Sequence, residues 1–109
     1  MTKFDPLFDI SGKTAIVTGA SSGLGMTFAK FLAQRGSNVV ISARRIEKIE
    51  ELSSQLNQQG FSSIAVPCDV TESSQVRDMF DSAEESFERV DIVVNNAGQI
   101  AEAGTVPEK

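Results

Sequence analysis

Three glycines fall within seven residues between a short apolar run and a helical stretch. The run is Ala-Ile-Val at residues 15–17, and the segment at residues 18–25 reads Thr-Gly-Ala-Ser-Ser-Gly-Leu-Gly. Residues without a Cβ let a backbone turn sharply between a strand and a helix, and they let a ligand approach closely. The free N–H groups of the first helical turn, with the helix dipole behind them, then favour a phosphate. The segment predicts a phosphate-binding loop of the dinucleotide type.

Apolar strands and amphipathic helices alternate along the rest of the chain. Strands apolar on both faces, separated by such helices, pair in parallel and are covered by helices on both sides. The crossovers are expected to be right-handed. The predicted fold class is therefore α/β, the N-terminal part of a Rossmann-type doubly wound sheet with strand order 3-2-1-4. The expected strands are residues 14–18, 38–43, 63–67 and 91–95, and the expected helices are residues 24–35, 45–59 and 72–87.

One ligand crevice is expected where the order of the strands reverses. In open α/β sheets this crevice lies outside the carboxyl ends of the strands. The segments that follow the carboxyl ends of the four expected strands are residues 18–25, 43–45, 68–70 and 95–98. We expect residues 1–12 to form an N-terminal arm and residues 13–109 a partial dinucleotide-binding domain.

Composition narrows the possible partners. The 109 residues carry a formal net charge of −5, which argues against general binding to nucleic acid or to an anionic membrane. Cys68 is the single cysteine and the chain has no histidine, so we expect no disulfide, no metal cluster and a reducing, cytoplasmic location. Cys68 is predicted to pack as a small apolar residue at a strand end, and a reactive thiol is the alternative. No stretch approaches the roughly 20 apolar residues of a membrane span.

Three motifs together resemble the N-terminal signatures of the short-chain dehydrogenase/reductase family. They are the glycine segment at 18–25, Cys-Asp-Val at 68–70 and Asn-Asn-Ala-Gly at 95–98, and the lead-in Phe-Asp-Ile-Ser-Gly-Lys at 8–13 also fits. The resemblance covers essentially the whole chain. It implies a dinucleotide cofactor whose pyrophosphate is held by the loop residues Gly19, Ser21, Ser22, Gly23, Leu24 and Gly25.

The same resemblance implies roles for the residues after the later strands. Asp69 would accept a hydrogen bond from the adenine amino group, with Val70 beside the ring. The ribose on the nicotinamide side would be lined by Asn96, Ala97 and Gly98. Other roles stay open for two of the residues after the strands. Asp69 could instead act as an anion near the N-terminus of the helix at 72–87. Asn95 could brace the sheet.

The residues after the second strand favour NADP(H) over NAD(H). NAD sites usually place an acidic residue at the end of this strand, where it bonds the ribose 2′-OH. Here that position is Ala43, followed by Arg44 and Arg45. A guanidinium pairs with phosphate through two parallel hydrogen bonds. One feature opposes this preference, because many NADP-preferring relatives carry a second basic residue where this chain has Ser22. The alternative interpretation is that Arg44 and Arg45 are surface residues at the start of a helix.

The resemblance also implies a hydride transfer whose catalytic residues this sequence does not supply. The family uses a Ser and a Tyr-x-x-x-Lys pair located tens of residues beyond the Asn-Asn-Ala-Gly strand, and the chain contains no Tyr. We therefore expect the N-terminal part of an NADP-dependent oxidoreductase acting on a carbonyl or alcohol, inactive by itself. The parent would be a homodimer or homotetramer. The alternatives are a complete short dinucleotide-binding module and a degenerate structural protein.

Overall fold

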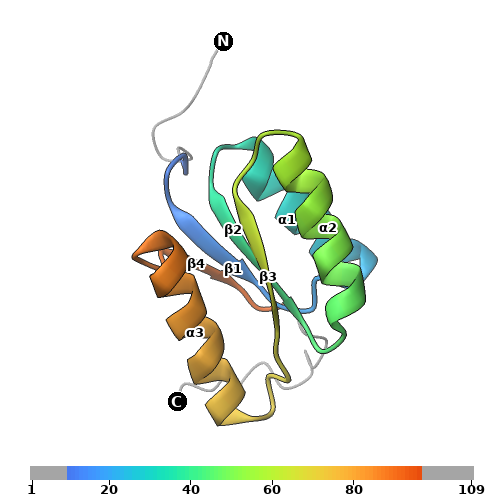
Figure 1. Cartoon of the computed structure of the whole chain (residues 1–109), viewed down its shortest axis with the longest axis vertical. Helices are drawn as coiled ribbons and strands as arrows, with labels where there is room; N and C mark the ends of the chain where they lie inside the picture. The colour runs from blue at the N-terminus through green and yellow to red at the C-terminus, as the bar shows by residue number, and fades with distance from the viewer. Residues whose placement is uncertain (1–9, 97–109) are drawn as a thin grey trace.

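Four parallel strands form one sheet in the order β3-β2-β1-β4. The computed structural model describes residues 10–96. Helices α1 and α2 cover one face of the sheet and α3 covers the other (Figure 1). The predicted fold class and strand order are confirmed. In chain order the elements are β1 (Thr14–Val17), α1 (Gly23–Gln34), β2 (Asn38–Ala43), α2 (Ile46–Gln58), β3 (Ser63–Pro67), α3 (Ser73–Phe87) and β4 (Ile92–Val94).

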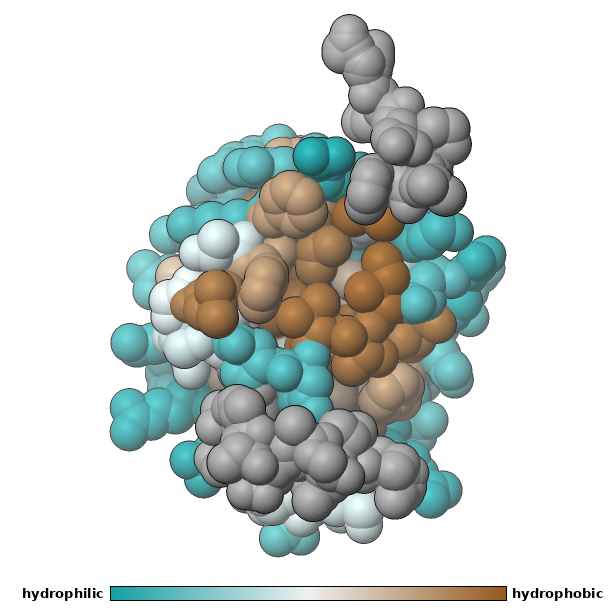
Figure 2. Space-filling view, turned by 180° about the vertical axis from the view of Figure 1, so that it is seen from behind, coloured by the Kyte–Doolittle hydropathy of each residue, from teal (hydrophilic) through white to brown (hydrophobic). Residues whose placement is uncertain are grey.

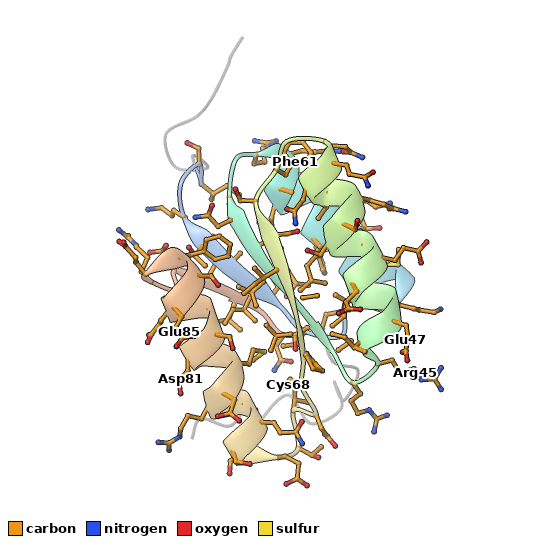
Figure 3. All side chains as sticks on the ribbon, in the orientation of Figure 1. Arg45, Glu47, Phe61, Cys68, Asp81 and Glu85 are labelled. Carbon is orange, nitrogen blue, oxygen red and sulfur yellow. The ribbon has the colours of Figure 1, made fainter. Side chains whose placement is uncertain are left out.

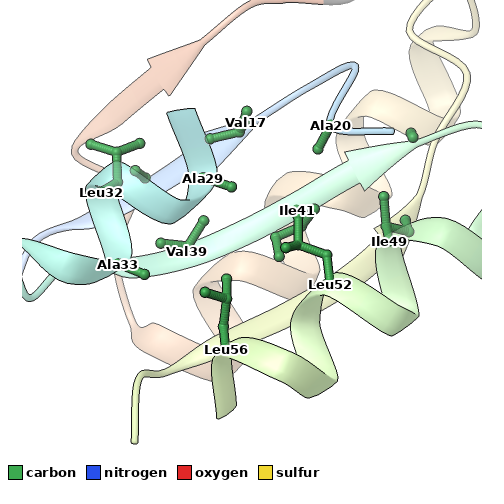
Figure 4. Packing of buried hydrophobic residues seen from close by; sticks show 12 residues of the cluster. Val17, Ala20, Ala29, Leu32, Ala33, Val39, Ile41, Ile49, Leu52 and Leu56 are labelled. Carbon is green, nitrogen blue, oxygen red and sulfur yellow. The ribbon is translucent and has the colours of Figure 1, made fainter. Parts of the chain in front are cut away.

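The two central strands are buried on both faces. Val39 and Ile41 of β2 point toward α1 and α2, where they pack with Leu52 of α2 (Figure 4). Their neighbour Val40 points the other way and packs with Met79 of α3. All of these side chains are at most 2% exposed. The continuous apolar runs of β1 and β2 therefore serve two cores, as parallel strands between helices require.

The outer strands are less buried than their apolar sequences predict. Val93 of β4 is 50% exposed, and Ile92 and Val94 are half-buried. Phe31 of α1 is 49% exposed, and the Arg35 guanidinium lies over its ring, 4.8 Å from the ring centroid. Apolar residues also gather on the back of the molecule (Figure 2).

Within residues 10–96 no helix has the length and apolar character needed to cross a membrane.

Candidate functional site

The segment between β1 and α1 is a tight turn held by its own hydrogen bonds. Gly19 has a φ of +65°, a conformation that L side chains rarely adopt. The Ser22 hydroxyl donates to the Gly19 carbonyl oxygen at 2.9 Å and accepts the Gly25 N–H at 3.3 Å, so Ser22 caps α1. The N–H groups of Gly23 and Leu24 have no hydrogen-bond partner among residues 10–96. They are therefore available to an anion at the start of α1.

The glycines of the loop are required for different structural reasons. A Cβ on Gly23 would meet nothing within 4 Å, so the space that a ligand needs is open there. A Cβ on Gly25 would press on the Gly19 carbonyl oxygen and lie 2.8 Å from both Ala20 Cα and Asn96 Nδ2. Gly25 is buried, and its φ is not positive. The sequence assigned the loop glycines to a sharp turn and to the close approach of a ligand. Gly25 instead lets α1 pack closely on the turn.

Polar side chains join the carboxyl ends of β1 and β4. The buried Thr18 hydroxyl donates to Asn95 Oδ1 at 3.1 Å and accepts the N–H of Asn96 at 2.9 Å. The Asn96 amide Nδ2 donates to the Gly19 carbonyl oxygen at 3.3 Å and to the Ser22 hydroxyl at 3.2 Å. Asn95 therefore braces the sheet, as the sequence left open, while Asn96 holds the glycine loop against β4.

These segments surround one cleft of about 580 Å³ at the carboxyl ends of the strands. Most of the described candidate residues line it. Gly23, Leu24 and Gly25 are absent from the lining. Ala97 and Gly98 lie outside the described residues. The lining residues are Gly19, Ser21, Ser22, Ala43, Arg44, Arg45, Cys68, Asp69, Val70, Thr71 and Asn96.

Asp69 is oriented by the turn that precedes α3. Its Oδ1 accepts the Thr71 hydroxyl at 2.6 Å and the Thr71 N–H at 2.9 Å, while its own N–H donates to Gln75 Oε1 at 2.8 Å. The Thr71 hydroxyl, followed by the Thr71 N–H, lowers the pKa of the Asp69 carboxyl, and Arg44 adds a smaller electrostatic contribution. The N-cap of α3 is Glu72. Asp69 therefore stabilises the turn before the helix, and its Oδ2 accepts no hydrogen bond from residues 10–96.

The two arginines after β2 differ in their placement. Ala43 is only 5% exposed and places no carboxylate at the end of the strand. Arg45 is the N-cap of α2 and makes no side-chain capping bond. Its side chain extends into solvent on the side of Glu47, away from Cys68 (Figure 3). Arg44 is close enough to Asp69 to affect the pKa of that carboxyl. Of the two arginines, Arg44 is thus the one whose charge contributes to the lowered pKa of Asp69.

Cys68 is a buried residue of the cleft lining. It is 3% exposed and packs with Ile16, Val40 and Met79, as predicted for a small apolar residue at a strand end. Burial raises the pKa of its thiol, which disfavours the thiolate.

Sequence reasoning missed Thr71 and Gln75, which hold Asp69. An aspartate followed two residues later by threonine is a recognisable side-chain turn, so the signal for Thr71 was present.

Comparison with known proteins agrees with this geometry. The model of the short chain dehydrogenase family matches residues 13–108. A fatty acyl-CoA reductase of Acinetobacter baylyi is 38% identical over 99 residues, which cover 89% of this chain and 34% of that protein. An uncharacterized oxidoreductase of Bacillus subtilis is 41% identical over 86 residues, covering 79% of this chain and 34% of the relative.

Solved structures give the same result. A short chain dehydrogenase/reductase from Burkholderia phymatum, in complex with NAD, superposes with a TM-score of 0.76 at 32% identity, covering 79% of this chain and 31% of that one. A hydroxysteroid dehydrogenase from Escherichia coli has the same TM-score and identity, over 79% of this chain and 36% of its own. The chain spans about a third of the length of the curated relatives named above. Those relatives are oxidoreductases, and this chain belongs to the short-chain dehydrogenase family.

Proposed function

We propose that the cleft binds NADP(H) in preference to NAD(H). The observation that carries this proposal is the pair Arg44 and Arg45 beside the buried Ala43, where an NAD site has its acidic residue. The Arg44 guanidinium would hold the 2′-phosphate, and Arg45, which also lines the cleft, would add positive charge beside it. The open space at Gly23 fits a pyrophosphate, as do the N–H groups of Gly23 and Leu24, which have no partner in the described part of the chain. On the family's pattern, Asp69 and Val70 would hold the adenine, and Asn96, Ala97 and Gly98 the ribose on the nicotinamide side.

The parent protein would be an oxidoreductase with a carbonyl or alcohol substrate. When bound, the nicotinamide supplies or accepts the hydride. The residues of this chain bind and orient the cofactor, and with no Tyr among its 109 residues the chain lacks the family's usual proton donor. We therefore propose that this polypeptide alone binds the dinucleotide without turnover. That the parent protein is a homodimer or homotetramer stays a prediction. A cytoplasmic location also stays a prediction, and its support is the single cysteine.

Replacing Arg44 tests the cofactor preference. A charge-assisted hydrogen bond contributes about 1.5–3 kcal/mol, so Arg44→Ala should lower the NADP(H):NAD(H) affinity ratio by roughly 10–150-fold. Arg44→Asp should lower it further, because a carboxylate repels the 2′-phosphate. The ratio is measured by titrating NADPH and NADH and following the nicotinamide fluorescence, with calorimetry as a check.

Arg77→Ala is the matched control, since Arg77 is an exposed arginine of α3 outside the cleft. It removes the same charge and should leave the ratio unchanged. An unchanged ratio in both Arg44 variants, or an equal loss in Arg77→Ala, would refute the assignment of the 2′-phosphate to this arginine.

A further inference from the structure

A second group of polar side chains lies away from the cleft, at the outer edge of β3. Among the described strands, β3 pairs with β2 alone. The Ser62 carbonyl oxygen accepts the Val39 N–H at 3.0 Å, and the Cys68 N–H donates to the Ala43 carbonyl oxygen at 2.9 Å. The backbone groups of successive residues in a strand face opposite neighbours. The residues of β3 whose backbone groups face outward are therefore Ser63, Ala65 and Pro67.

The side-chain amide of Asn57, on α2, occupies the outward position at Ser63. Its Oδ1 accepts the Ser63 N–H at 2.9 Å, and its Nδ2 donates to the Ser63 carbonyl oxygen at 3.1 Å. A side-chain amide offers the same donor and acceptor as a peptide group. Asn57 therefore takes the place that the backbone of a neighbouring strand would take.

A buried hydroxyl pair fixes Asn57 in this position. The hydroxyl oxygens of Ser53 and Ser63 lie 2.7 Å apart, and the Ser63 hydroxyl also donates to Asn57 Oδ1 at 3.1 Å. Both serines are 7% exposed. Buried hydroxyls are costly without partners, so this network keeps the amide facing Ser63.

Little of the edge remains available for pairing. Pro67 has no N–H to donate. Among the described residues of β3, Ala65 is the one that still offers both an outward N–H and an outward carbonyl. It lies beside a shallow hollow of about 640 Å³ between α2 and β3. Strand addition needs a row of unpaired backbone groups, and here the row is reduced to one residue.

We propose that the side-chain amide of Asn57 closes the outer edge of β3 against pairing with a second copy of the chain. A second copy is the relevant partner because it presents the same edge, so two β3 strands meet through identical residues. Removal of the amide frees both backbone groups of Ser63 and restores a run from Ser63 to Ala65 on each copy.

The test compares Asn57→Ala with Gln58→Ala in the full chain. Gln58 is the next residue of α2, is exposed, and makes no side-chain hydrogen bond within residues 10–96. Sedimentation velocity over a concentration series measures self-association, and hydrogen exchange reports on the Ala65 amide. With a few net backbone bonds gained per dimer, Asn57→Ala should associate at least about tenfold more tightly than wild type. Its Ala65 amide should become protected as concentration rises, and Gln58→Ala should match wild type.

Asn57→Asp covers the case in which Asn57→Ala does not fold. A carboxylate still accepts the Ser63 N–H but frees the Ser63 carbonyl. We therefore expect Asn57→Asp to associate more tightly than wild type and less tightly than Asn57→Ala. A folded variant at Asn57 whose concentration dependence equals that of wild type would overturn the proposal. Tighter association that leaves the Ala65 amide unprotected would overturn it as well, because the copies would then meet elsewhere.

Discussion

At the scale of single residues, Gly23 and Gly25 separate ligand binding from packing. Gly25→Ala should cost about 1–3 kcal/mol of unfolding free energy, because its Cβ presses on the Gly19 carbonyl oxygen. Gly23→Ala should change stability by no more than about 0.5 kcal/mol, since the site is open. It should nevertheless weaken NADPH binding, because the methyl group stands where the phosphate would approach. Urea unfolding and NADPH titration of both variants measure this, and equal losses of stability would contradict it.

Asp91 makes the stability of the fold depend on pH. Arg89 donates three side-chain hydrogen bonds to its carboxylate and Thr14 N–H a further one, and these lower the pKa of Asp91. A carboxylate with a lowered pKa stabilises the fold fully above its ordinary value of 3.8, and the stabilisation is lost as the pH falls through the folded pKa.

Asp91→Asn should therefore lower the urea midpoint at pH 7 and lose that difference from wild type as the pH drops below 3.8. Asp81→Asn is the control, because Asp81 is exposed on α3 and its side chain forms no hydrogen bond or ion pair within residues 10–96. A difference between Asp91→Asn and wild type that stays constant from pH 7 to the acid limit would show that the charge is not responsible.

At the scale of elements, the hydroxyl of Thr18 ties β1 to β4. Thr18→Val keeps the shape but leaves the Asn96 N–H without its partner, and the expected cost is about 1–3 kcal/mol. Thr27→Val removes an exposed hydroxyl whose one partner among the described residues is the Gly23 carbonyl of its own helix, with an expected effect within about 0.5 kcal/mol. Urea unfolding and hydrogen exchange at Asn96 compare the two variants. Equal effects, or an Asn96 amide as protected in Thr18→Val as in wild type, would contradict this role.

Periodicity and glycine placement predicted the elements because they act locally. The strands 38–43 and 63–67 were predicted to the residue, and the other elements differ from prediction by a residue at one or both ends. Helix α1 begins at Gly23 because Ser22 folds back as its cap. The contact of Gly25 with Asn96, 71 positions away in the chain, depends on how α1 packs against β4, and local patterns do not carry that information. The turn that holds Asp69 was readable but overlooked.

At the scale of the whole molecule, the two outer strands differ in how they are protected. Asn57 covers part of β3, whereas Val93 of β4 is 50% exposed and β4 pairs with β1 alone among the described strands. An apolar edge strand that is exposed favours pairing with another chain, so we expect self-association through β4. Val93→Lys should weaken self-association by about tenfold, since a charge on an edge strand opposes pairing. Sedimentation velocity measures it, and association as strong as that of wild type would assign the contact to another surface.

The most direct test of the proposed site is amide mapping with NADP⁺ by nuclear magnetic resonance. The account predicts saturable shifts at Gly23, Leu24, Arg44, Asp69 and Asn96, which come from four separate segments around the cleft. The amides of Asn57 and Ala65, at the hollow beside β3, should not move. Saturable shifts centred on that hollow, or no saturable shifts at the carboxyl ends of the strands, would contradict the assignment of the cleft as the dinucleotide site.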